Sequence, residues 1–195
     1  MAQAAISDES ERLLDALRTL LLEKRIITAD EIDERIRITD TASPAMGAAM
    51  VARAWTDPEY RTLMLRDGTK AAEEMGAAMR AMPPLDVLEN TPGLHHLVVC
   101  TLCSCYPRAV LGYPPFWFKS ASYRARAVRD PRGTIAEWGT VLPDHVRIRV
   151  VDSTADYRWM VLPMRPVGTE GWDRERLAGL VREGDMIGVT VPSAE

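Results

Sequence analysis

Cysteine is scarce in this chain and is absent outside one short segment. All three cysteines among the 195 residues, Cys100, Cys103 and Cys105, lie in the stretch VCTLCSCYP at 99–107. An odd number of cysteines cannot all pair within the chain. In a reducing compartment, clustered thiols are more typical of a metal site or a catalytic site than of disulfides. This segment is therefore the first candidate for function.

The chain also lacks a long apolar run and an excess of basic residues. No stretch approaches the roughly 18 apolar residues that a membrane-spanning helix needs. The net charge of −4 and isoelectric point near 5.5 argue against nucleic acid or an anionic membrane as the main partner, since both require a basic face. The N-terminal residues show no basic region followed by an apolar stretch, so no secretory signal is expected. We expect a cytoplasmic protein.

Residues 1–76 carry the apolar periodicity of helices, with few aromatic residues among them. Ser7 is a candidate N-cap. Five leucines behind it fall on one face at helical spacing: Leu13, Leu14, Leu17, Leu20 and Leu21. Thr28 and Glu31 form a capping-box pattern, and Asp57 before a proline marks another helix start. This segment is either a helical arm that contacts a partner or a helical subdomain that packs on its own core.

From residue 77 onward the pattern changes to mixed helix and strand, with frequent prolines. Alternating apolar residues and other β-like runs predict strands, and one helical pattern separates the last two of them. The strand patterns occupy 146–150, 157–162 and 186–191, and the helix lies near 174–181. The predicted fold class is α+β: an N-terminal helical arm over 1–76, followed by a mixed α/β layered domain over 77–195 that carries the cysteine loop.

The cysteine spacing has a direct consequence for metal binding. If the sulfurs of Cys103 and Cys105 bind one ion, the backbone amides of Ser104 and Cys105 are carried to the same ion. The small chelate rings then form a near-planar claw, which Cys100 can cap axially, leaving one octahedral position open. Amide nitrogen binds only after losing its proton, so trivalent cobalt or iron suits this site better than zinc. An open position permits Lewis-acid activation of water or substrate.

Two other interpretations fit the same spacing. A tetrahedral structural zinc site can be built from the three cysteines with His95 or His96 as the fourth ligand. Three clustered thiols can also form a redox switch. From the residues alone, all three interpretations stay open.

At these residues the chain resembles the α subunit of nitrile hydratase. The motif Cys-Thr-Leu-Cys-Ser-Cys at 100–105 is highly specific, and Thr101 and Tyr106 resemble the cobalt branch of the family. The resemblance extends over most of the chain from about 47 to 191. It includes VARAWTDPEY at 51–60, DGT at 67–69, ENTPGLHHLVVC at 89–100, YRARAVRDPR at 123–132 and RPVGTEGW at 165–172.

The resemblance implies a site and an activity. Cys100 is implied as the axial thiolate, Cys103 as a sulfinate and Cys105 as a sulfenate. The Ser104 and Cys105 amides are implied as further metal ligands, and Cys105, Ser104 and Cys103 as the catalytic residues. The implied cofactor is one cobalt(III) ion per chain, with iron(III) as the alternative. The implied reaction hydrates a nitrile to its amide.

The resemblance also implies partners. In the family a β-type subunit covers the site and supplies arginines to the oxidised cysteines, because guanidinium groups bind such oxygens well. We therefore expect a hetero-oligomer. The inertness of trivalent cobalt makes a maturation chaperone a further expectation.

Two departures from the family pattern fall where the substrate pocket is expected. Arg108 and Ala109 stand where the family usually has Trp-Pro, and Ala81 replaces a common glutamine. We hypothesise a larger substrate, such as the heteroaromatic nitrile taken by the toyocamycin nitrile hydratase branch. Thiocyanate hydrolase, whose metal-bearing subunit shares the motif, is the closest alternative, and a structural zinc-binding subunit is the second.

Overall fold

The computed structural model describes residues 8–80, 82–103 and 105–194. The chain divides into two compact units, Met1–Thr41 and Ala42–Glu195. The sequence placed this division near residue 76. The difference arises because the helices between 44 and 74 bury their apolar faces in the core of the second unit.

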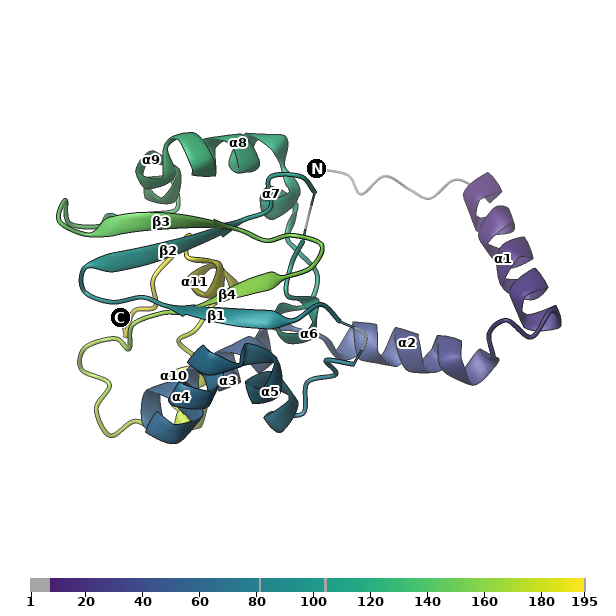
Figure 1. Ribbon diagram of the computed structural model, residues 1–195, viewed down its shortest axis with the longest axis horizontal. Coiled ribbons are helices and arrows are strands. Elements are labelled where there is room, and N and C mark those ends of the chain that lie inside the picture. Colours follow the sequence, from purple (N-terminus) through teal and green to yellow (C-terminus); the bar gives the residue numbers. More distant parts are fainter. Residues whose placement is uncertain (1–7, 81, 104, 195) are drawn as a thin grey trace. The chain divides into compact units, whose positions relative to one another are not determined.

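The first unit contains two helices, α1 (Asp8–Glu23) and α2 (Ala29–Thr41), drawn in purple and blue in Figure 1. The predicted capping box of α2 is confirmed. The Thr28 N–H donates to the Glu31 carboxylate at 2.8 Å, and the Glu31 N–H donates to the Thr28 hydroxyl at 3.2 Å. The predicted cap at Ser7 lies outside the described residues.

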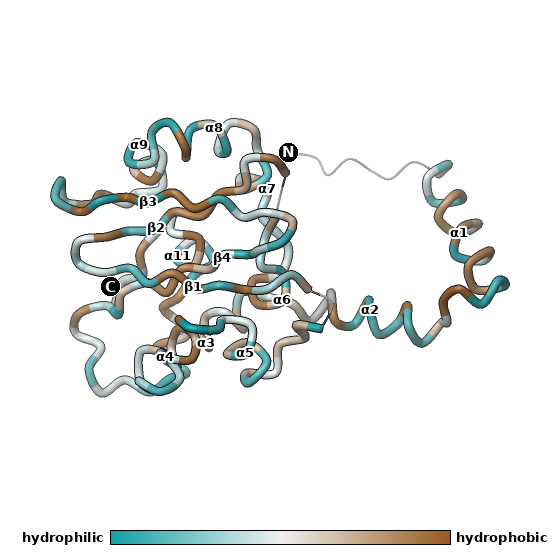
Figure 2. The backbone as a smooth tube through the Cα atoms, in the orientation of Figure 1, coloured by the Kyte–Doolittle hydropathy of each residue, from teal (hydrophilic) through white to brown (hydrophobic). Residues whose placement is uncertain are grey.

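The leucine stripe of α1 is exposed. Leu13, Leu14, Leu17 and Leu20 keep between 46% and 65% of their surface accessible. Figure 2 shows these apolar positions recurring along the helix. Because exposed leucines at helical spacing are unfavourable in water, the stripe is suited to contact with another surface.

The second unit begins with α3 (Pro44–Thr56), α4 (Pro58–Arg66) and α5 (Gly68–Glu74). Asp57 caps α4, as its sequence predicts: its carboxylate accepts from the Tyr60 N–H at 3.0 Å, and a proline opens the helix. Both α4 and α5 contact strand β1 (Leu85–Glu89). The helices α4 and α5 therefore pack against β1.

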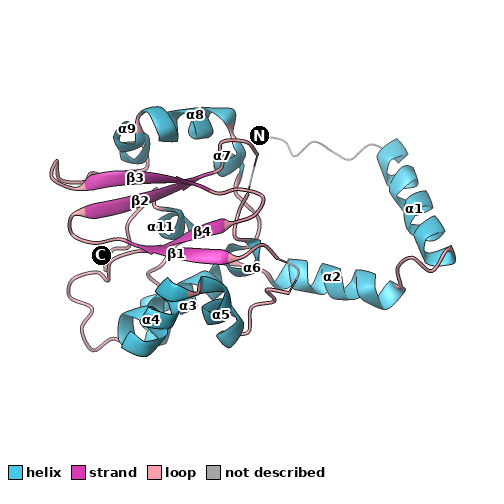
Figure 3. Cartoon of the chain, in the orientation of Figure 1, coloured by secondary structure: helices cyan, strands magenta, loops and turns pink. Residues whose placement is uncertain are grey.

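Two parallel strand pairs form the centre of this unit. The β1 strand pairs with β4 (Arg158–Leu162), and β2 (Leu94–Val99) pairs with β3 (Arg147–Asp152). The two pairs are in contact through β2 and β4 (Figure 3). The strands predicted around 146–150 and 157–162 are thus confirmed, and so is the α+β class.

Short helices cover both strand pairs. The β2–β3 pair is flanked by α8 and α9, whereas α11 contacts β2 and β4, and α10 contacts α3. None of the described helices is long and apolar enough to cross a bilayer. The bounds are α6 (Arg108–Leu111), α7 (Phe116–Lys119), α8 (Ala121–Arg129), α9 (Pro131–Ala136), α10 (Arg174–Ala178) and α11 (Glu183–Ile187).

The strand predicted at 186–191 is wrong. Met186 and Ile187 end the helix α11, and Gly188 closes it in the left-handed conformation, with φ of +87°. The Arg182 N–H donates to the Asp185 carboxylate at 2.7 Å at the helix start. A short apolar run buried on all sides has no periodicity that separates a strand from a helix end, which explains the error.

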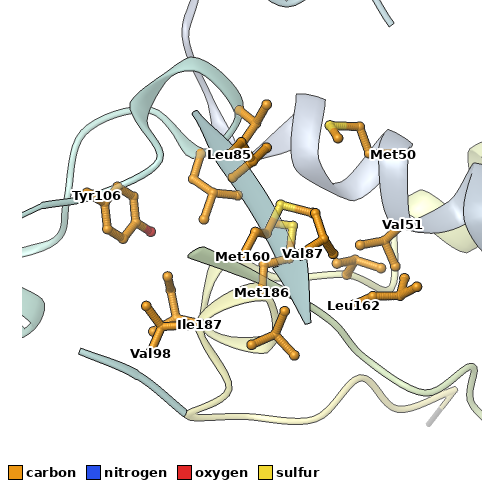
Figure 4. Close-up of a cluster of buried hydrophobic side chains, with 14 of the residues drawn as sticks. Met50, Val51, Leu85, Val87, Val98, Tyr106, Met160, Leu162, Met186 and Ile187 are labelled. Atoms are coloured by element: carbon orange, nitrogen blue, oxygen red, sulfur yellow. The ribbon is translucent and has the colours of Figure 1, made fainter. Parts of the chain in front are cut away.

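The core lies between α3, the strands and α11. Figure 4 shows Met50 and Val51 of α3 in one buried cluster with Met160 of β4 and Met186 of α11. All four are fully buried. The strand β2 ends where the cysteine segment begins, so the core fixes the position of the candidate site.

Candidate metal centre

The cysteine segment begins where two paired strands end. Val99 is the last residue of β2, and its register partner is Asp152, the last residue of β3. Because the strands are parallel, their carboxyl ends meet, and the Asp152 carboxylate lies beside the segment. It accepts from the Thr101 N–H at 2.9 Å and from the Thr101 hydroxyl at 2.5 Å. Arg124 of α8 donates to the Thr101 carbonyl at 3.3 Å.

The three cysteine sulfurs converge. All three lie within 4.8 Å of one another, and the Cys103 sulfur is 3.5 Å from that of Cys100 and 3.2 Å from that of Cys105. Cys100 and Cys105 are buried, whereas Cys103 is exposed. Ser104, the predicted amide ligand between them, lies outside the described residues.

These sulfur separations fit one metal ion. With metal–sulfur bonds of about 2.3 Å, two sulfurs at a right angle lie about 3.3 Å apart, and two at a tetrahedral angle about 3.8 Å. The 3.2 Å between Cys103 and Cys105 matches the right angle, whereas the 3.5 Å between Cys100 and Cys103 lies midway between the two values. A right angle at the Cys103–Cys105 pair suits a square-planar or octahedral ion better than zinc.

The surroundings of Cys105 disfavour an isolated thiolate. Burial, together with the sulfurs of Cys103 and Cys100, raises the pKa of the Cys105 thiol to about 12, although the positive charge of Arg158 opposes this rise. A cation bound by the three sulfurs would supply the missing positive charge. Metal binding would then drive deprotonation of the cluster.

Tyr106 anchors the C-terminal end of the segment. Its ring packs edge-on against Phe118, with 4.9 Å between centroids, and its hydroxyl donates to the Glu183 carboxylate of α11 at 2.5 Å. Burial raises the pKa of both Tyr106 and Glu183. The segment is thus held at one end by Asp152 and at the other by α11.

Neither His95 nor His96 joins the sulfurs. The His95 Nε2–H donates to the Gly188 carbonyl at 2.7 Å, and its Nδ1 accepts from the Asn90 side chain at 3.1 Å. The same Asn90 accepts from the His96 N–H at 2.8 Å. Among the described residues, the group able to hold a metal consists of the three cysteines. The zinc alternative therefore gains no histidine ligand from this structure.

A pocket of about 340 Å³ is lined in part by Cys103 and Cys105. Its lining includes Arg108 and Ala109, the two residues singled out by their departure from the family pattern. Ala81, the third such residue, lies outside the described residues. The remaining lining residues are Met79, Met82, Pro83, Leu85, Tyr106, Pro107, Val110 and Arg158.

Comparison with known proteins identifies the family over most of the chain. The family model for the nitrile hydratase alpha chain matches residues 8–190. The chain belongs to this family. It is 47% identical to the low-molecular-weight cobalt-containing nitrile hydratase subunit alpha of Rhodococcus rhodochrous, covering 96% of this chain and 91% of that protein. The resemblance seen in the sequence is therefore confirmed.

Two solved structures of relatives show the same fold. A recombinant thiocyanate hydrolase with partially modified cobalt centres superposes with a TM-score of 0.87 at 42% identity, covering 96% of this chain and 91% of that one. A double mutant of the Fe-type nitrile hydratase from Comamonas testosteroni Ni1 gives 0.85 at 39% identity, covering 97% and 93%. The fold is thus common to cobalt and iron members and to two named activities.

The sequence alone did not predict three residues near the cysteine segment: Asp152, Arg158 and Glu183. Asp152 lies two residues beyond the strand predicted at 146–150, and Arg158 lies at the start of the next predicted strand. Their placement beside the cysteines depends on which strands pair. An acidic residue at a strand end is a usable signal only once that strand is known to lie parallel to the one that precedes the motif.

Proposed function

We propose that this chain is the metal-bearing subunit of an enzyme that hydrates nitriles to amides. The observation that carries the proposal is the pocket that Cys103 and Cys105 line. Membership of the nitrile hydratase alpha-chain family supports it. A metal site and a cavity for an organic molecule are therefore adjacent on one chain.

The proposed cofactor is cobalt(III), one per chain, held by the sulfurs of Cys100, Cys103 and Cys105 and by the Ser104 and Cys105 amides. The separation of the Cys103 and Cys105 sulfurs, near that expected for a right angle, supports this, as do the cobalt-containing relative and Thr101 and Tyr106 of the motif. Iron(III) is the alternative, because an Fe-type relative has the same fold. When bound, the trivalent ion supplies Lewis acidity that polarises the nitrile and lowers the pKa of water.

We further propose that Cys103 is a sulfinate and Cys105 a sulfenate in the mature enzyme. The exposure of Cys103 gives oxidants access to it. The positive charge of Arg158 reaches Cys105 and favours negatively charged forms of its sulfur. Either the Cys105 sulfenate oxygen or an activated water is the nucleophile that attacks the nitrile carbon.

The pocket residues orient the substrate. Met79, Met82 and Leu85 form an apolar wall that excludes water and packs against the organic part of the nitrile. Arg108 and Ala109 stand where the family usually has Trp-Pro, so the bulky Trp ring is absent from this pocket. A bulky, heteroaromatic nitrile remains the proposed substrate class.

The proposed partner is a β-type subunit. The exposed leucine stripe of α1 offers a surface for it, and Cys103 is exposed at a site that the reaction requires to be covered. We also propose loading by a maturation chaperone, because trivalent cobalt exchanges ligands slowly. A cytoplasmic location is proposed from the clustered thiols.

The test is hydration of a nitrile panel by the complex purified after co-expression with its partner and with cobalt. Amide formation that is lost in Cys105→Ser and retained in Asp144→Ala, a change at an exposed residue outside the motif, supports the proposal. Hydration of thiocyanate in preference to every nitrile would favour the alternative activity, which the likeness to thiocyanate hydrolase makes the second candidate. Bound zinc without either activity would favour a structural subunit.

A further inference from the structure

The leucine stripe of α1 is symmetric about Leu17. Leucines lie three and four positions before it and three and four positions after it: Leu13, Leu14, Leu20 and Leu21. Because residues three and four apart share one face of a helix, all five lie on the same face of α1. Leu17 itself keeps 53% of its surface exposed. A face with this symmetry is self-complementary, as the interface of a two-fold dimer must be.

Pairing with a second copy matches leucine with leucine. When two α1 helices run antiparallel with Leu17 opposite the second copy's Leu17, the other four leucines meet in symmetric pairs. Leu13 then faces the second copy's Leu21, and Leu14 faces the second copy's Leu20. A parallel pair would also match leucine with leucine, so the apolar residues alone do not fix the direction.

The charges at the two ends of α1 fix the direction. Glu9 and Glu11 lie near its start, and Lys24 and Arg25 follow its last residue. All four side chains are exposed, and none forms an ion pair among the residues that the structure describes. Antiparallel pairing places the acidic end of each helix beside the basic end of the other, whereas parallel pairing would place like charges together.

We propose that, without its partner subunit, the chain forms a homodimer in which two α1 helices pair antiparallel about Leu17. The pairing covers an apolar face that is otherwise exposed to water. A partner subunit that binds the same face has to displace the second copy, so the homodimer competes with assembly of the complex. The inference concerns association and does not depend on the proposed reaction.

The size of α1 sets the strength of this dimer. A helix of 16 residues is about 24 Å long, so one pair of such helices buries less surface than a standard protein interface. We therefore expect a reversible dimer with a dissociation constant on the order of 10–100 µM. A dimer of this strength releases the chain readily to a partner that binds more tightly.

Sedimentation equilibrium of the full-length chain, produced without a partner and kept in reductant, tests the proposal over about 2 to 500 µM. We expect a monomer–dimer equilibrium. Leu17→Gln should weaken the dimer about thirtyfold, because each dimer loses two half-exposed leucines from the centre of its interface. Val128→Gln, at an apolar residue of α8 that is 52% exposed, is the matched control and should leave the dissociation constant unchanged.

A charge exchange tests the direction. Glu11 lies beside the second copy's Arg25 in the antiparallel pair, and this contact occurs twice in each dimer. Glu11→Arg and Arg25→Glu should each weaken the dimer about fivefold at low salt, the scale of two exposed charge pairs. The double variant should regain the affinity of the unchanged chain, and high salt should reduce all these differences.

The outcomes separate cleanly. A chain that stays monomeric at 500 µM, or that forms assemblies larger than a dimer, overturns the proposal. A dimer of equal strength in Leu17→Gln also overturns it, because the interface then lies elsewhere. A double charge variant that is weaker than either single variant rejects the antiparallel arrangement. Loss of the dimer in Leu17→Gln together with recovery in the double variant upholds the proposal, whether or not the complex hydrates nitriles.

Discussion

The Asp152 carboxylate holds Thr101 by two hydrogen bonds, one from its backbone N–H at 2.9 Å and one from its hydroxyl at 2.5 Å. Thr101 follows the first cysteine of the cluster, and Asp152 ends the strand paired with β2. The Asp152 side chain therefore ties the beginning of the sulfur-bearing segment to the end of β3. We expect the positions of the three sulfurs to depend on this contact.

Replacing Asp152 with alanine should loosen the segment. We expect Asp152→Ala to lower the free energy of unfolding by about 1 kcal/mol, since both bonds are partly screened by solvent. Cobalt should also be lost faster to a chelator, because the sulfurs are less well placed. Urea unfolding and metal content after dialysis measure the two effects.

The matched control is Asp144→Ala, at an exposed acid in the loop before β3. It should leave the metal content and the urea midpoint close to those of the unchanged chain. Equal cobalt loss in both variants would show that the Thr101 contact does not position the sulfurs.

Gly188 should tolerate no side chain. Its φ of +87° disfavours any L residue, and a Cβ there would overlap the His96 carbonyl oxygen. Gly139 has a similar φ of +83° but faces open space. We expect Gly139→Ala to cost about 1 kcal/mol from the backbone alone and Gly188→Ala about 3 kcal/mol or more. Thermal or urea unfolding compares the pair, and equal costs would contradict the close packing of Gly188 on β2.

The buried histidines should make the fold sensitive to mild acid. Burial lowers the pKa of His95, against the opposing hydrogen bond to Gly188; burial, Arg149 and His95 lower that of His96. Below about pH 6.5 these histidines bind protons in the unfolded chain more readily than they do in the folded chain. The free energy of unfolding should therefore decrease as the pH is lowered, by at most about 1.4 kcal/mol per pH unit for each histidine.

Urea unfolding at pH 7.5, 6.5 and 5.5 measures this slope. His95→Gln should flatten it, whereas His145→Gln, at an exposed site, should not. A slope that is unchanged in His95→Gln would show that His95 takes up no proton on unfolding in this range.

Local patterns predicted the helix starts correctly where residues a few positions apart determine the structure. The Thr28–Glu31 capping box and the Asp57 cap were readable because each depends on residues a few positions apart. The 186–191 segment was misread because burial on all sides removes the periodicity that separates strand from helix. The sequence did not predict the division into two units between residues 41 and 42, because an apolar helix face does not indicate which surface it packs against.

For the site too, the sequence predicted the part that depends on residues a few positions apart. The cysteine spacing indicated a metal site or a redox switch, and the structure brings the three sulfurs together. Asp152, Arg158 and Glu183 were not predictable, because they approach the cluster from strands and helices roughly fifty to eighty positions away. Their contribution depends on tertiary pairing, which the spacing of the motif does not encode.

The central claim is that the three cysteines form an oxidised cobalt site. Elemental analysis and peptide mass spectrometry of the purified complex test it most directly. We predict about one cobalt per chain, one added oxygen at Cys105 and two at Cys103. Iron with the same oxidation would contradict the assigned metal alone. Zinc with unmodified thiols, in protein produced with cobalt and its partner, would contradict the account itself.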